Sequence, residues 1–324
     1  MDPKNRDHSI DIIRGFAILV MIPANFSPSL LPDPPPFWFR IFESLAAPLF
    51  VCISGYISSA YFTISLYKNI QRALFVLLAA AAVDFLIWQT TPFFSFDVLY
   101  VIGFCIPLHY LVRKWNSNYT LALAIVLMVT SPVMQFIFGY NEDLAYLNDI
   151  KDQPVHLIIL RMVQSFFIDG WFPFLPWAGI SMLGRFLFLN SEKKFIIHGA
   201  LLTGISVILY FFFPSPWHLR EGNSELFYPP GVVFLTFSTG FLFLIFSFKN
   251  AFDNSFFRHS KLFGRHSLAI YFLHLALAAY VLHRSDISGW YAYAIICVAS
   301  IVFFYLFFFF YEKDIFKKLI SKDQ

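Results

Sequence analysis

The chain has 324 residues, of which 58% are hydrophobic and only 13% are charged. Its mean hydropathy of +0.66 lies far outside the range of soluble globular domains and excludes that class. The formal net charge of +3 comes from basic residues scattered over short loops, a pattern that excludes a nucleic-acid-binding protein. We therefore predict an all-α, polytopic membrane protein that forms a single domain over residues 1–324.

Apolar runs long enough to cross a hydrocarbon core of about 30 Å as helices follow one another along the chain. Ten runs meet this length, near residues 10–30, 38–62, 70–90, 96–113, 119–138, 171–189, 195–213, 229–248, 263–283 and 290–311. The apolar stretch 154–168 is shorter and contains Arg161 and Gln164, so we expect an interfacial or re-entrant helix there. Membrane lipids are thus the expected surroundings of most of the chain.

Lys and Arg are unequally divided between the loops that these ten spans define. When both termini are placed in the cytoplasm, seventeen basic residues lie inside and five outside, with Arg14 counted apart because it lies within the first span. Short loops rich in Lys and Arg stay on the cytoplasmic side, which predicts cytoplasmic N- and C-termini. The basic N-terminus precedes a long apolar run without a small-residue cleavage site and indicates an uncleaved signal anchor. The compact chain favours a bacterial inner membrane as its location.

The first span carries the densest set of polar residues in the predicted helices. Asp11 and Arg14 are three residues apart and can pair on one helix surface, which lowers the cost of burying either charge. Asn25 follows about three turns after Arg14, so the two lie on nearly the same face and roughly 16 Å apart. Pro23 removes a helix hydrogen bond beside Asn25, which favours a cavity over lipid there. The structural alternative is an Asp–Arg clasp and a polar contact between helices.

Five sequence blocks along the chain carry a resemblance to a known family. In order they are residues 9–21, 39–56, 171–184, 228–231 and 263–274. Together they resemble the heparan-α-glucosaminide N-acetyltransferase-like membrane family. The resemblance implies transfer of an acyl group, expected to be acetyl, from a cytoplasmic acyl-CoA through the membrane. The acceptor that it implies is a hydroxyl or amine of a glycan or similar molecule on the far side.

The donor that the resemblance implies is acyl-CoA, in particular acetyl-CoA, and its phosphates require cations at the cytoplasmic mouth of the site. Arg14, paired with Asp11, and Arg265 at the start of the ninth span are the candidate donor-binding residues. Both arginines are also placed to assist the thioester carbonyl, where negative charge develops. Ordinary positive-inside flanking is an equally good explanation of Arg265. No residue spacing in the chain indicates a metal site.

The base that must take the acceptor's proton is where the chain departs from the family pattern. Related membrane acyltransferases often carry a histidine eleven residues after the arginine, and here that place is Asn25. In the heparan-type enzymes an asparagine is expected at this place, followed by a catalytic histidine in the first outer loop. Here that loop is 27–36, and no histidine occurs between His8 and His109. The base expected from the resemblance is therefore missing.

Glu43 and His274 are the candidate replacements, and Asn25 completes the predicted catalytic set. Glu43 lies near the outer end of the second span, where a buried carboxylate can act as a general base. His274 lies about eleven residues into the ninth span, and a titratable group at that depth is a functional hypothesis by default. Packing or donor binding is the alternative role of His274. Four other titratable residues are interpreted as solvated or structural: Asp33, Asp84, Asp97 and His109.

Two functions follow from these observations. The first is a membrane acyltransferase with a relocated base. The second is a family-like protein that has lost the chemistry and serves as a carrier, flippase or binding protein, with the proline-broken segment 172–177 as its moving part. No inverted repeat is evident, which weakens a transporter, and no phosphate-loop, zinc-protease or nucleophile-elbow motif supports another enzyme class. A homo-oligomer is left open.

Overall fold

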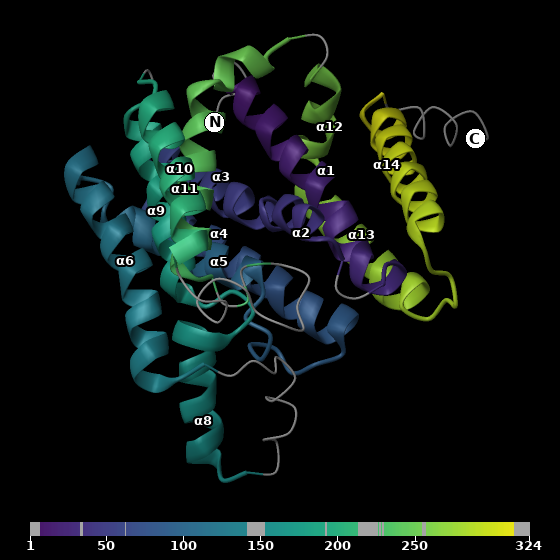
Figure 1. The fold of residues 1–324 in the computed structure, drawn as a ribbon, viewed down its shortest axis with the longest axis horizontal. Helices are drawn as coiled ribbons and strands as arrows, with labels where there is room; N and C mark the ends of the chain where they lie inside the picture. The colour runs from purple at the N-terminus through teal and green to yellow at the C-terminus, as the bar shows by residue number, and fades with distance from the viewer. Residues whose placement is uncertain are drawn as a thin grey trace. The chain divides into compact units, whose positions relative to one another are not determined.

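The computed structural model describes residues 7–32, 35–61, 63–140, 153–191, 193–212, 226, 228, 230–254 and 257–313. Over these ranges all regular elements are helical (Figure 1), in agreement with the predicted all-α class. The element order follows the predicted runs of apolar sequence, and the breaks between helices fall at proline, glycine and polar residues.

Five of the described helices are long and apolar enough to cross a membrane, and the number rises to seven if each of two bent helix pairs is one span. The five are His8–Leu30, Phe37–Ala60, Leu66–Trp88, Ser117–Phe138 and Trp290–Glu312. Three shorter apolar helices, Val98–Leu111, Ile196–Phe212 and Val232–Ser247, coincide with further predicted runs. Several candidate membrane-spanning helices are thus present, whereas the full set of ten and the cytoplasmic termini stay predictions.

The chain divides into two compact units. Unit 1 comprises Met1–Ala46 together with Lys249–Gln324, and unit 2 comprises Ala47–Phe248. The first boundary falls inside the apolar run 37–60, which forms the short helix α2 (Phe37–Ser44) and α3 (Ala46–Ala60). It lies directly after Ala46, the first residue of α3. The first and last parts of the chain therefore belong to the same unit.

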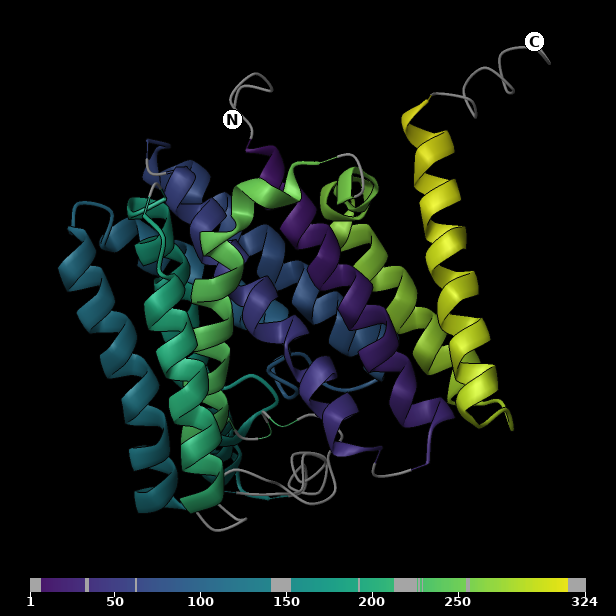
Figure 2. The same ribbon diagram turned by 45° about the horizontal axis from the view of Figure 1, so that its top comes forward.

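Unit 1 is built around α1 (His8–Leu30), which begins where the side chain of Asp7 accepts a hydrogen bond of 3.1 Å from the backbone N–H of Ser9. Its other described elements are α2, η5 (Lys249–Phe252), η6 (Phe257–His259), α12 (Ser260–Arg265), α13 (Ser267–Leu277), η7 (Ala278–Leu282) and α14 (Trp290–Glu312). The chain turns by 82° between the helical stretches Phe257–Arg265 and Ser267–Leu282. In Figures 1 and 2, α1 runs beside α12 and α13. The yellow helix is α14, the last described helix of the unit.

The contact between α1 and α12 is close because glycine stands where the two backbones meet. A Cβ atom on Gly15 would overlap the backbone carbonyl of Ser260, and one on Gly264 would overlap the carbonyl of Asp11. Small residues four apart allow such an approach between membrane helices. The polar first turns of α1 are therefore fixed against the end of α12.

Unit 2 contains α3, α4 (Leu66–Ala82), η2 (Val83–Trp88), α5 (Val98–Leu111), α6 (Ser117–Phe138), α8 (Val155–Gln164), η3 (Ser165–Asp169), α9 (Phe174–Leu189), α10 (Ile196–Phe212) and α11 (Val232–Ser247). Its interior helix is α9, in which every residue from Leu175 to Leu187 is buried. Glycines again mark the close contacts: a Cβ on Gly184 would overlap the carbonyl of Cys52 in α3, and one on Gly55 would overlap the carbonyl of Ser181. α3 and α9 therefore pack backbone to backbone.

The segment predicted as an interfacial or re-entrant helix forms α8 and η3. No residue of α8 is buried, whereas Ser165, Ile168 and Asp169 of η3 are. The stretch Val155–Asp169 meets α9 at an angle of 43°, so the two make either a broken span or a re-entrant loop. The re-entrant form of the prediction agrees with this bend.

Candidate functional site

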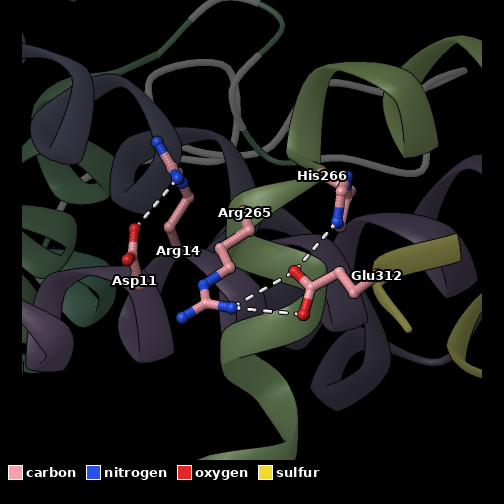
Figure 3. Close-up of polar contacts among 5 residues, drawn as sticks. All are labelled: Asp11, Arg14, Arg265, His266 and Glu312. Atoms are coloured by element: carbon pink, nitrogen blue, oxygen red, sulfur yellow. Dashed lines mark hydrogen bonds and ion pairs between the residues drawn. The ribbon is translucent and has the colours of Figure 1, made fainter. Parts of the chain in front are cut away.

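The charged pair predicted in the first span is present at the start of α1. Arg14 Nη2 donates to Asp11 Oδ1 at 3.0 Å (Figure 3). The Asp11 side chain is 5% exposed and that of Arg14 is 19% exposed, so the cation is the more accessible partner. The two opposite charges neutralise each other within an apolar helix. The predicted pairing of Asp11 with Arg14 is confirmed.

A second polar contact joins α1 to α13, deeper in unit 1. Asn25 Nδ2 lies 3.0 Å from His274 Nε2, and the same amide nitrogen donates to the backbone carbonyl of Met21 at 3.1 Å. His274 Nδ1 lies 2.8 Å from the backbone carbonyl of Ile270. His274 is fully buried and Asn25 is half-buried. Two residues that the sequence placed in one site are thereby in direct contact.

The partners of this histidine determine which of its nitrogens carries the proton. A carbonyl oxygen can only accept, so His274 Nδ1 must donate to Ile270. In a neutral ring Nε2 then holds the lone pair, and it accepts the N–H of Asn25. The site therefore contains an imidazole whose basic nitrogen is aimed at Asn25.

Aromatic side chains surround this imidazole. The ring of Phe26 lies 6.5 Å and that of Tyr271 lies 5.6 Å from the His274 ring, measured between centroids. Such surroundings exclude water and strengthen the hydrogen bonds that remain. The orientation of His274 is thus set both by its hydrogen bonds and by its neighbours.

Glu43, the other candidate base, lies in α2 and is 1% exposed. Its carboxyl group interacts electrostatically with Tyr293 and Cys297 of α14. The ring of Phe39, one turn before Glu43, meets Tyr293 edge to face at 5.7 Å. The carboxylate is buried, and the contacts described for it lead to α14, whereas those of Asn25 lead to α13.

Arg265, the second arginine among the candidate donor-binding residues, is exposed at the surface of unit 1. Its Nη1 donates to both carboxylate oxygens of Glu312 at 3.2 Å, and His266 Nε2 lies 3.1 Å from one of them. The neighbouring Gly264 abuts the carbonyl of Asp11, so the backbone of Arg265 is tied to the first turns of α1. Asp11 and Arg14, two of the three predicted donor-binding residues, thus lie in α1. Arg265, the third, follows a glycine that packs against α1.

Unit 2 contains a polar cluster that the sequence reasoning missed in part. His109 Nε2 of α5 lies 2.9 Å from the hydroxyl of Ser181 in α9. Arg185, only 2% exposed, donates through Nη2 to the carbonyls of Arg113 at 2.9 Å and Trp115 at 3.3 Å. Arg185 is one of the seventeen basic residues that the topology prediction places on the cytoplasmic side. Its position inside the predicted span 171–189 was the signal that it is buried.

Asp84 is another buried acidic residue, and its partners come from the loop that follows η2 and from Tyr100 of α5. Its carboxylate accepts from the backbone N–H of Phe93 at 3.0 Å, from the hydroxyl of Tyr100 at 2.7 Å and from the hydroxyl of Ser95. The interpretation of Asp84 as structural agrees with this set. Among the residues that the structure describes, no three His, Cys, Asp or Glu side chains are grouped to hold a metal ion.

Comparison with protein-family models gives a match over residues 6–194 to the family described as heparan-alpha-glucosaminide N-acetyltransferase, catalytic. The matched range covers more than half of the chain. It contains the sequence blocks 9–21, 39–56 and 171–184, whereas the blocks 228–231 and 263–274 lie beyond it. No individual curated protein matches the chain.

Proposed function

Because the chain belongs to the heparan-alpha-glucosaminide N-acetyltransferase catalytic family, we propose that it moves an acetyl group from cytoplasmic acetyl-CoA to an acceptor across the membrane. The acceptor is a hydroxyl or amine of a glycan, and the membrane is a bacterial inner membrane. The family supports acyl transfer in general. The long apolar helices support a reaction that takes place within a bilayer.

The observation that carries this proposal is the contact between Asn25 and His274. General-base catalysis needs an atom with a free electron pair within hydrogen-bond reach of the acceptor. His274 Nε2 is such an atom, and its present partner, Asn25, is half-buried instead of enclosed. An acceptor hydroxyl or amine that takes the place of the Asn25 amide would meet this electron pair directly.

The transfer then proceeds with all protons accounted for. The acceptor oxygen or nitrogen attacks the thioester carbonyl carbon while its proton moves to His274 Nε2. The N–H of Asn25, released from the ring, donates to the carbonyl oxygen as negative charge develops there. The carbon–sulfur bond breaks, and the thiolate of coenzyme A takes the proton from Nε2, which restores the neutral imidazole. Glu43 is the alternative base in this scheme.

The donor is expected to lie along α1. Arg14 and Asn25 are separated by about three helical turns, or roughly 16 Å. The extended pantetheine arm of the coenzyme can bridge such a separation, with its phosphates near Arg14 and its thioester near Asn25. Asp11 keeps the guanidinium in place before the phosphates arrive.

The test is turnover by the purified protein in lipid nanodiscs, with acetyl-CoA and a panel of amino sugars and neutral sugars. Release of the coenzyme thiol and the mass of the acetylated product are measured together. We expect His274→Gln and Asn25→Leu to lower turnover by about 100-fold or more, because each removes a group that acts in the proton transfer. Arg14→Gln should raise the KM for acetyl-CoA more than it lowers kcat.

Arg161→Gln is the matched control, because Arg161 is an exposed arginine of α8 that bonds Gln164. Glu43→Gln identifies the base: a loss as large as that of His274→Gln would move this role to Glu43. Export of a sugar without thioester cleavage would overturn the acyltransferase proposal. It would favour the carrier or flippase instead, for which the 43° bend between Val155–Asp169 and α9 is the relevant feature.

A further inference from the structure

The elbow between α12 and α13 presents two basic side chains to one carboxylate. Glu312, the last residue of α14, receives hydrogen bonds from Arg265 Nη1 at 3.2 Å to each of its oxygens. His266 Nε2 lies 3.1 Å from Glu312 Oε1 (Figure 3). A basic pair and an acidic residue 46 and 47 positions further along the chain are thus brought together by folding alone.

The basic pair is held in place independently of this carboxylate. The His266 ring stacks on Phe308 at a centroid distance of 4.4 Å and meets Tyr311 edge to face at 5.9 Å. Arg265 follows Gly264, whose backbone abuts α1 at Asp11. Release of Glu312 would therefore leave Arg265 and His266 where they are.

The carboxylate itself is easily released. The side chains of Arg265 and Glu312 are 37% and 33% exposed. Exposed ion pairs contribute only about 0–1 kcal/mol each, because water screens them and their side chains lose freedom. A phosphate group carries more charge than a carboxylate and offers more acceptor oxygens to a guanidinium. A phosphate that reaches the elbow should therefore compete well with Glu312.

We propose that Arg265 and His266 form a phosphate-binding site and that the Glu312 carboxylate is its internal occupant, which the phosphate of an incoming ligand displaces. The proposal rests on the proposed function in one respect, since acyl-CoA is the phosphate-bearing ligand that this function supplies. Binding of the donor then frees the Glu312 side chain, while Phe308 and Tyr311 keep α14 in contact with His266. Arg265 thereby has a ligand-binding role, in addition to marking the cytoplasmic end of a predicted span.

The experiment measures ligand affinity of the full-length protein in nanodiscs at fixed ionic strength. The probes are coenzyme A, adenosine 3′,5′-bisphosphate and inorganic phosphate. We expect Glu312→Gln to tighten binding of the two nucleotides about 2- to 5-fold, the affinity equivalent of an exposed ion pair. Arg265→Gln should weaken it about 10-fold. Asp253→Asn is the matched control, since it changes the charge by the same amount at an exposed residue of unit 1.

Unchanged nucleotide affinity in Glu312→Gln overturns the proposal, provided that its thermal midpoint shows the protein to be folded. If that variant is unstable, Arg265→Gln with unchanged nucleotide affinity overturns it equally. Tightening for inorganic phosphate alone shows a site for the free ion and overturns the assignment to the coenzyme. Failure of the proposed function is recognised separately: bisphosphate binding responds to Glu312→Gln, yet no variant or wild-type protein cleaves acetyl-CoA.

Discussion

Each unit of the molecule buries a histidine in an apolar helix, and the two histidines have different hydrogen-bond partners. His274 in unit 1 has a carbonyl at Nδ1 and an amide at Nε2, so its proton can occupy only one nitrogen. His109 in unit 2 meets the Ser181 hydroxyl at Nε2. Its Nδ1 has no hydrogen-bond partner among the described residues. Because a hydroxyl can donate or accept, either tautomer of His109 is compatible with its surroundings.

The difference shows how a buried histidine suited to chemistry can be told from one that serves packing. His274 has a fixed proton, a fixed electron pair and a half-buried neighbour that a ligand can replace. Ser181, the neighbour of His109, is 1% exposed and lies in α9 beside the buried Arg185. Burial alone does not separate the two rings, since both are almost fully enclosed. The hydrogen-bond partners of the ring nitrogens distinguish the two histidines.

The largest effect is expected where the two histidines are exchanged for alanine. His274→Ala should lower acetyl transfer by about 100- to 10,000-fold, the usual contribution of a general base. It should also lower the thermal midpoint, because it removes two hydrogen bonds of a fully buried side chain. His109→Ala should leave turnover within about 3-fold and lower stability by about 1–3 kcal/mol, because it removes the hydrogen bond between His109 and the buried Ser181 hydroxyl. Turnover and thermal unfolding are measured on the same samples. The reverse pattern would exchange the roles assigned to the two units.

The glycine contacts allow a comparison of the two units at the level of packing. Gly264→Ala in unit 1 and Gly184→Ala in unit 2 each place a Cβ against a backbone carbonyl. Both should lose about 2–3 kcal/mol of stability by overpacking, and only Gly264→Ala should also raise the KM for acetyl-CoA, because it displaces Arg265 from α1. Gly204→Ala in α10 is the control, since its Cβ would meet nothing within 4 Å. Equal KM effects in both units would contradict this separation.

The smallest effect is expected at the buried carboxylate of unit 2. Asp84→Asn keeps the shape of the side chain but turns an acceptor into a donor among three groups that donate to it. We expect a loss of about 1–2 kcal/mol in the free energy of unfolding and no change in the KM for acetyl-CoA. Asp286→Asn, at an exposed position, serves as the control. A raised KM in Asp84→Asn would instead give unit 2 a part in donor binding.

Local spacing in the sequence was sufficient for part of the site. The pairing of Asp11 with Arg14 follows from the helix period alone, and the structure confirms it. His274 could be selected because a titratable group in the middle of an apolar run is costly without a purpose. Its contact with Asn25 joins residues 249 positions apart, and no period or spacing encodes such a separation.

The charges of unit 2 show where sequence reasoning was insufficient. Arg185 is placed by its sign among the cytoplasmic cations, although its guanidinium is buried and donates to the backbone carbonyls of Arg113 and Trp115, in the turn that follows α5. The partners of Asp84 could not be named, because one is a backbone N–H and two are hydroxyls of ordinary residue types. Hydrogen bonds to backbone and hydroxyl groups leave no distinctive pattern in a sequence, whereas opposite charges at a helical interval do.

The separation between Asn25 and His274 also sets an order of events during synthesis. A ribosome that adds about 5–20 residues per second delivers His274 at least some ten seconds after Asn25. During that time α1 lacks both α12 and α13. The ion pair between Asp11 and Arg14 needs no residue from elsewhere, so it can neutralise the charges of the nascent helix while its later partners are still being translated.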